Sequence, residues 1–226
     1  MKPRLIAFAA ALLFAQSALA GPPLLCQVFD IGGAKSLPWQ GSDWSAVRAD
    51  YDASRLVEDT LALLGPDTPV IVRMETLRRA TLYARKDGKV ADSLLARLKA
   101  RASDGESKGK AGSLALFDAG YLVETYRQAY QISKAVKDSY WKFSQADPGN
   151  VDGYAWIMKA IQARGGDPEM EFAAALASED PAMGRKGGDE HLRRAVAGAR
   201  KGSLLARNLE KHFEHRGKRA PEFASQ

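Results

Sequence analysis

The stretch LALFDAGYLVETY, residues 114–126, decides the fold that we expect for this chain of 226 residues. On a helical wheel, at about 100° per residue, its apolar side chains surround most of the helix. Gly120, Glu124 and, just beyond the stretch, Arg127 mark a polar strip. A helix that is apolar nearly all round is covered by neighbours on two sides. The stretch therefore predicts an interior helix of a larger helical assembly.

Residues 151–164 follow the same pattern. One apolar stripe contains Tyr154, Met158 and Ile161, and a second contains Trp156 and Ala160. Helical spacing of apolar residues continues through most of the chain, without the alternation that is typical of strands. We expect the polar run 103–112 to be a flexible loop and further helices at about 52–64, 69–86, 94–102, 113–128, 131–145, 168–178 and 188–214. The predicted fold class is all-α, with antiparallel helix pairs joined by short turns.

Residues 147–177, DPGNVDGYAWIMKAIQARGGDPEMEFAAALA, resemble a tetratricopeptide repeat (TPR) unit. The likeness rests on a short set of positions: Asp147 and Pro148 before the first helix, Tyr154 near the usual aromatic position, Gly165 in the turn, and Ala174 and Ala177 in the second helix. The segment departs from the family at Met170, where alanine is preferred, and it lacks the Leu-Gly pair of the first helix. The resemblance implies a short TPR-like array of stacked helix pairs, and such arrays usually bind peptides or proteins.

The ends of the chain differ from its middle. Residues 1–20 have the basic start, the apolar run and the small-residue site of a secretory signal, so we expect cleavage before Gly21 and a periplasmic or extracellular location. An irregular lead-in is predicted at 21–43, a helical repeat domain at 44–184, and a basic C-terminal capping helix with its tail at 185–226. From Arg185 to Arg219 there are eleven Lys or Arg residues against four acidic ones.

Cys26 is the single cysteine of the chain. An intrachain disulfide is therefore excluded, and the fold must rest on its apolar core. Cys26 is interpreted as a small buried hydrophobic residue, with an intermolecular or regulatory thiol as the alternative.

Asp118 falls between Leu114 and Leu122 on the wheel of the first stretch. Its carboxylate is therefore expected to be buried and to need a partner from another helix. The alternative is a functional acid in a pocket.

Aromatic residues are concentrated between Phe117 and Trp156, where they fit either inter-helix packing or a peptide groove. The ligand-facing set predicted from this concentration is Tyr126, Arg127, Tyr130, Trp141, Asn150 and Tyr154.

The basic C-terminal helix closes the core in one interpretation and binds a polyanion or anionic lipid in the other. The polyanion-binding candidates are Arg193, Arg194, Arg200, Lys201, Arg207 and Lys211. DNA is not an expected partner of an exported protein. His212 and His215 have a spacing that suits zinc, but further ligands are missing, so neither a metal nor another cofactor is predicted.

No nucleophile-elbow motif is present, and no histidine precedes residue 191. The sequence therefore favours an exported, non-catalytic interaction module that binds a peptide or protein of the cell envelope. The first alternative is a protein that binds the envelope surface through its basic helix. The second is an enzyme that uses carboxylates such as Asp118 and Glu124.

Overall fold

The computed structural model describes residues 23–136, 151–179 and 184–225. Within these ranges the regular structure is helical, apart from an isolated bridge between Arg200 and Ala224, which confirms the all-α prediction. The helices are α1 (Pro23–Cys26), α2 (Leu56–Leu63), α3 (Val70–Ala84), α4 (Gly88–Glu106), α5 (Ser113–Val136), α6 (Gly153–Ala163), α7 (Pro168–Ser178), α8 (Gly188–Gly198) and α9 (Leu204–His215).

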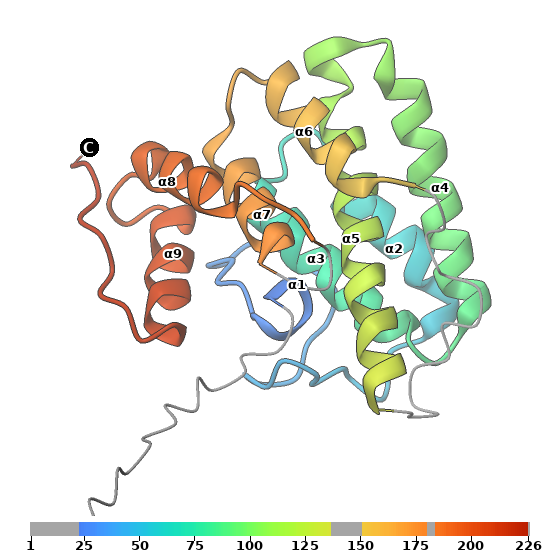
Figure 1. The fold of residues 1–226 in the computed structure, drawn as a ribbon. Helices are drawn as coiled ribbons and strands as arrows, with labels where there is room; N and C mark the ends of the chain where they lie inside the picture. Colours follow the sequence, from blue (N-terminus) through green and yellow to red (C-terminus); the bar gives the residue numbers. More distant parts are fainter. Residues whose placement is uncertain (1–22, 137–150, 180–183, 226) are drawn as a thin grey trace, which may run out of the picture.

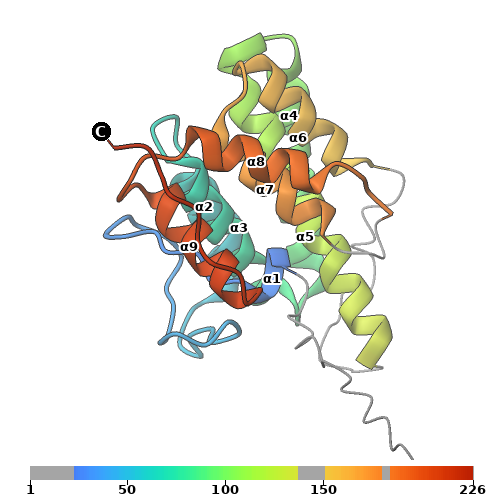
Figure 2. The same cartoon turned by 60° about the vertical axis from the view of Figure 1, so that its left-hand side comes forward.

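Helix α5 is the centre of the arrangement (Figure 1). Helices α4 and α6 pack along it, and α3 also contacts it. Its apolar side chains are buried nearly all round the helix, as the wheel predicts: Leu116, Phe117, Ala119, Tyr121, Leu122, Val123 and Tyr126. Helix α8 packs along α7. In Figure 1 α9 lies below α8 at the left-hand edge of the molecule, and in Figure 2 this side is turned toward the viewer. Whether these helices form a TPR-like array stays a prediction.

The polar strip of α5 does not face solvent but meets the start of α6. Gly120 lies against Gly153, whose carbonyl oxygen would be 2.5 Å from a Cβ built at position 120. Glu124 accepts a hydrogen bond of 2.9 Å from the backbone N–H of Tyr154, and Arg127 donates to the carbonyl of Val151. The strip is thus the contact surface for the next helix.

The lead-in is irregular over most of its length, as predicted, but it belongs to the core. Leu24 and Leu25 of α1 are fully buried, together with Phe29 and Leu37. One apolar cluster joins these residues to the middle helices and to Leu205 of α9. The lead-in, the helical region and the C-terminal segment therefore share one core.

Several predicted helix boundaries are wrong. Helix α4 continues to Glu106, so the expected flexible loop shrinks to a short connection that includes a 3₁₀ turn, Gly109–Ala111. Helix α5 runs unbroken to Val136, across the expected break near residue 130. The rest of the predicted helix 131–145 lies outside the described residues.

The expected helix 188–214 is two helices, α8 and α9. Gly202 between them has φ of +77°, a left-handed conformation that a continuous helix does not contain. Ser203 then accepts a hydrogen bond from the N–H of Ala206 and so caps α9. Within the described ranges, we find no helix whose length and apolar character suffice to cross a lipid bilayer.

Gly120→Ala is expected to lower the free energy of unfolding by about 1–3 kcal/mol, because the new methyl group would collide with the backbone of α6. Urea denaturation of both proteins measures the change. Gly33→Ala is the matched control, since a Cβ at position 33 meets nothing within 4 Å. Equal destabilisation by the two substitutions would contradict the close helix contact.

Candidate functional site

Tyr154 lies in the first turn of α6. Among the residues predicted to face a ligand, it is the one whose side chain contacts several other segments. Its hydroxyl lies 2.8 Å from Nε2 of His191 on α8 and 3.3 Å from Oγ of Ser178 at the end of α7. The guanidinium carbon of Arg185 lies 4.4 Å from the centre of its ring. Side chains from three segments therefore fix this aromatic residue.

His191 is held in turn by a buried carboxylate. Its Nδ1 lies 2.5 Å from Oε2 of Glu171 on α7, and both side chains are buried. A carboxylate accepts, so Nδ1 of His191 donates to Glu171, and Nε2 on the other side of the ring faces the Tyr154 hydroxyl. Glu171, His191 and Tyr154 thus form a hydrogen-bonded chain from the core to the surface of α6.

Glu124 of α5 supports the same residues from the other side. Its Oε1 accepts from the Tyr154 N–H, and its Oε2 lies 2.8 Å from Nη2 of Arg185. Burial raises the pKa of the Glu124 carboxyl, while Arg185 and Arg127 act in the opposite direction. The backbone and the ring of Tyr154 are therefore both tied, directly or through Arg185, to this carboxylate.

Tyr154 borders an open groove of about 620 Å³, which we name the Tyr154 groove. Its lining comes from α6, from the residue before it and from α8: Asp152, Tyr154, Ala155, Met158, Lys159, Ile161, Gln162 and Arg194. Apolar side chains and charges of both signs are combined in this lining. The groove can hold a chain segment that carries an apolar side chain between polar groups.

The other predicted ligand-facing residues do not line this groove. Tyr126 is fully buried and donates a hydrogen bond of 3.2 Å to the carbonyl of Ala91, so the prediction for it is wrong: its ring fills the contact between α4 and α5. Arg127 and Tyr130 are half-buried on α5, and Arg127 is directed at the start of α6. Trp141 and Asn150 lie outside the described residues.

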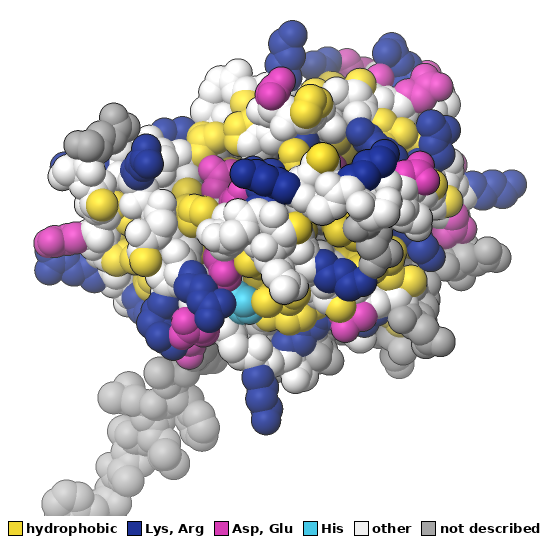
Figure 3. All heavy atoms as spheres, turned by 90° about the horizontal axis from the view of Figure 1, so that it is seen from above, with side chains coloured by type: hydrophobic (Ala, Val, Ile, Leu, Met, Phe, Trp, Pro, Cys, Tyr) yellow, Lys and Arg dark blue, Asp and Glu magenta, His cyan; other side chains and the backbone are white. Residues whose placement is uncertain are grey.

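The polyanion-binding candidates occupy two helices and the turn between them. Arg193 and Arg194 of α8 both contact Glu190, and Arg207 and Lys211 of α9 both contact Asp30 of the lead-in. Arg200 and Lys201 lie exposed in the connecting turn. Figure 3 shows one face of the molecule, on which Lys and Arg side chains alternate with acidic and apolar ones.

Asp118 is buried, as the wheel predicts, and its partner comes from another helix. Its Oδ2 lies 2.6 Å from Nη1 of Arg73 on α3, whose guanidinium also donates to the carbonyls of Thr68 and Gly65. Burial raises the pKa of the Asp118 carboxyl to about 6, although Arg73 acts against the shift. Asp118 does not line the Tyr154 groove and joins α5 to the start of α3.

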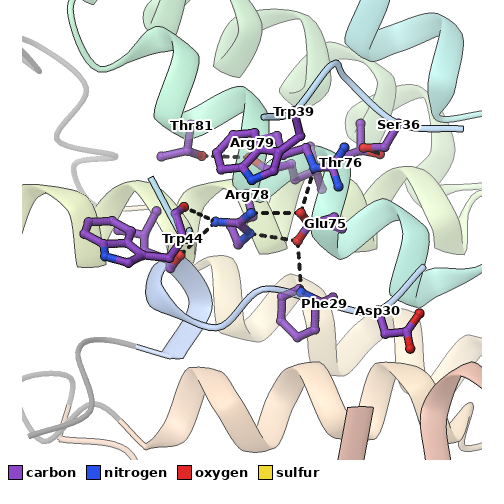
Figure 4. Close-up of polar contacts among 12 residues, drawn as sticks. Phe29, Asp30, Ser36, Trp39, Trp44, Glu75, Thr76, Arg78, Arg79 and Thr81 are labelled. Atoms are coloured by element: carbon purple, nitrogen blue, oxygen red, sulfur yellow. Dashed lines mark hydrogen bonds and ion pairs between the residues drawn. The ribbon is translucent and has the colours of Figure 1, made fainter. Parts of the chain in front are cut away.

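A buried charge cluster around Glu75 was not predicted from the sequence (Figure 4). Glu75 of α3 is fully buried and accepts hydrogen bonds from Nε of Arg78 and Nε of Arg79, each 2.7 Å, and from the N–H of Phe29, 3.1 Å. The spacing of one glutamate with arginines three and four residues later, in METLRR at 74–79, is the signal that could have revealed it.

The two arginines of this cluster bind the irregular lead-in. Arg78 donates to the carbonyls of Leu25 and Trp44, and Arg79 donates to that of Leu37. Both guanidinium groups also lie over the ring of Trp39, 4.8 and 5.4 Å from its centre. These donors are occupied by the chain itself, which makes the cluster a structural element of the fold.

A second pocket, of about 250 Å³, lies between α1, the end of α7 and α9, and we name it the Cys26 pocket. It is lined by Pro23, Cys26, Gln27, Glu179, His212, His215 and Arg216. Among the described residues, no group of three or more His, Cys, Asp or Glu side chains is placed to hold a metal ion.

Comparison with protein-family models, with curated proteins and with solved structures found no match to this chain.

Asp118→Ala is expected to lower the free energy of unfolding by about 3–5 kcal/mol, because it leaves the buried guanidinium of Arg73 without its counter-ion. Urea denaturation at neutral pH measures the change. Asp104→Ala, at an exposed position of α4, is the control, and an unchanged midpoint for Asp118→Ala would contradict the buried ion pair.

Cys26 is expected to react slowly with iodoacetamide. Burial raises the pKa of its thiol to about 11, against a lowering by Arg78, so the reactive thiolate is scarce at pH 8. The expected rate is on the order of 100-fold below that of an ordinary cysteine. The rate should rise with pH towards about pH 11, and a plateau near pH 8.5 would contradict the shift.

Proposed function

We propose that this chain is an exported, non-catalytic binding protein that holds a peptide segment of a cell-envelope protein in the Tyr154 groove. Export rests on the signal-like residues 1–20. The observation that carries the binding proposal is the fixation of Tyr154 at the groove by Glu171, His191 and Arg185.

A fixed aromatic side chain suits recognition, because little conformational freedom is lost when a partner packs against it. Met158 and Ile161 add apolar surface, while Asp152 and Arg194 add opposite charges. This combination matches a peptide with an apolar side chain that is flanked by polar or charged groups. It is less suited to a small, uniformly charged ligand.

Binding of a polyanion through the C-terminal helices has weaker support. Four of its six candidate residues already contact acidic side chains of this chain. A polyanion would have to compete with these contacts, most of which are solvent-exposed pairs of small net stability.

The test is selection from a random peptide library on the purified protein, followed by measurement of Kd for the enriched peptide. Met158→Asp should weaken binding by at least about tenfold, because it places a charge in the apolar part of the groove. Tyr154→Phe should also weaken it, since the ring loses its hydrogen bond to His191. Arg97→Glu, exposed on α4, is the matched surface control and should leave Kd unchanged.

Point substitutions are used instead of removal of residues 185–226. That segment contains α8, which buries His191 and Ala195 and packs along α7, so its loss would expose the core. Failure to enrich any peptide, or equal Kd values for the parent protein and Met158→Asp, would overturn the proposal.

A further inference from the structure

Arg185 occupies a place that is built for a cation. The carbon of its guanidinium group lies 4.4 Å from the centre of the Tyr154 ring. Its Nη2 lies 2.8 Å from Oε2 of Glu124 and 3.5 Å from Oδ1 of Asp152. Aromatic faces and carboxylates are the groups that attract guanidinium ions in proteins. We name Glu124, Asp152 and Tyr154 together the cation site.

The buried member of the cation site requires a positive charge beside it. The side chain of Glu124 is only 1% exposed, and its Oε2 lies against Arg185. Arg127 lies 3.9 Å from the other oxygen, Oε1, which also accepts from the N–H of Tyr154. Removal of one partner from a buried ion pair is strongly unfavourable, because it leaves the other charge uncompensated. A group that takes the place of Arg185 therefore has to be a cation.

Arg185 itself is held by few contacts. It lies in the connection before α8, between Gly184 and Gly187, whose φ values of +59° and +93° show that no helix fixes this backbone. Its Nη1 is buried without a hydrogen-bond partner among the described residues, which reduces the net gain from burying the side chain. The contact with Asp152 is long, and that carboxylate is 65% exposed. Rotation of the Arg185 side chain about its own bonds is therefore enough to vacate the cation site.

The cation site adjoins the Tyr154 groove. Asp152 and Tyr154 belong to both, whereas Arg185 is not part of the groove lining. A peptide that lies in the groove therefore has the cation site directly beside it.

We propose that the cation site binds an arginine side chain of the peptide partner, and that Arg185 occupies this site in the free protein as an internal competitor. The proposal rests on the proposed peptide groove and adds the chemistry of one side chain of the partner. A planar guanidinium can stack on Tyr154 and pair with Glu124 at once, as Arg185 does. The arriving group makes the same contacts, so Tyr154 remains fixed after the exchange.

The test uses N-acetyl-arginine methylamide, a single blocked residue that is too short to fill the groove. It is titrated into the parent protein and into Arg185→Ala at constant ionic strength, while the imidazole C–H signals are followed by NMR. His191 is the reporter, since its ring centre lies 6.0 Å from that of Tyr154, and the signals of His212 and His215 should stay in place. Arg185→Ala should bind the probe with a dissociation constant on the order of 1 mM.

The parent protein should show the same His191 shift at concentrations at least about tenfold higher, because the tethered Arg185 side chain competes at a high effective concentration. This exchange is the result that a purely structural ion pair would not give. Arg185→Lys is the second variant, because it keeps a positive charge beside Glu124 for the fold but lacks the planar guanidinium. Its affinity for the probe should lie between those of the parent protein and Arg185→Ala.

Matched probes and variants test the chemistry of the site. N-acetyl-citrulline methylamide has nearly the same shape without the charge, and it should bind Arg185→Ala at least about tenfold more weakly. Addition of Glu124→Gln to Arg185→Ala should remove binding, since it keeps an oxygen acceptor for the Tyr154 N–H but not the negative charge. Arg193→Ala, which removes an exposed arginine of α8, should bind the probe no better than the parent protein does.

Three results would overturn the proposal. One is the absence of a saturable His191 shift in both Arg185→Ala and Arg185→Lys. Another is equal binding of the citrulline probe. The third is a parent protein without any shift at about one hundred times the dissociation constant of Arg185→Ala, which would make Arg185 a fixed structural residue. Each leaves the peptide groove standing, because its own test, the loss of affinity in Met158→Asp, does not involve the cation site.

Discussion

The buried carboxylate of Glu75 is the constraint on which the rest of the structure depends. It holds Arg78 and Arg79 on the same face of α3, and these two side chains donate to backbone carbonyls of the irregular lead-in. A buried, irregular segment has carbonyl groups that no helix or sheet satisfies, and each unpaired one costs about 1–3 kcal/mol. The guanidinium groups satisfy several of them, while Glu75 gives the fully buried Arg78 and the partly buried Arg79 a shared counter-charge. The lead-in can therefore cover the core without regular structure.

Other carboxylates, buried or partly buried, join the helices in the same manner. Glu169 of α7 accepts from the N–H of Ile71 at the start of α3, where the preceding Pro69 makes no side-chain cap. Glu124 accepts from the N–H of Tyr154 at the start of α6, and Glu171 is hydrogen-bonded to His191 of α8. Helix starts carry unpaired N–H groups and a partial positive charge, so a carboxylate from a neighbouring helix satisfies both requirements. Apolar packing and these carboxylate hydrogen bonds together determine the position of Tyr154.

Periodicity alone was sufficient to predict the all-α fold, the two-sided burial of α5 and the burial of Asp118 with a partner from another helix. The errors have physical causes. Tyr126 has a polar tip, but a single backbone carbonyl, that of Ala91, satisfies it inside the core. Gly120 and Glu124 form a polar strip on the wheel, and a wheel does not show that the start of another helix lies against this strip. His191 and Glu171 are twenty residues apart, and only the folded chain brings them together.

The uneven charge of the sequence follows from the same contacts. The basic C-terminal segment contacts acids of the rest of the chain: Arg185 with Glu124, Arg207 and Lys211 with Asp30, and Arg216 with Glu179. Part of its positive charge is thus paired with acidic residues of this same chain. The basic segment therefore does not by itself require a polyanionic partner. The segment also supplies His191 and Arg194 to the Tyr154 groove and its support, and His212 and Arg216 to the Cys26 pocket. The Tyr154 groove and the Cys26 pocket therefore form only when the C-terminal helices are packed on the rest of the chain.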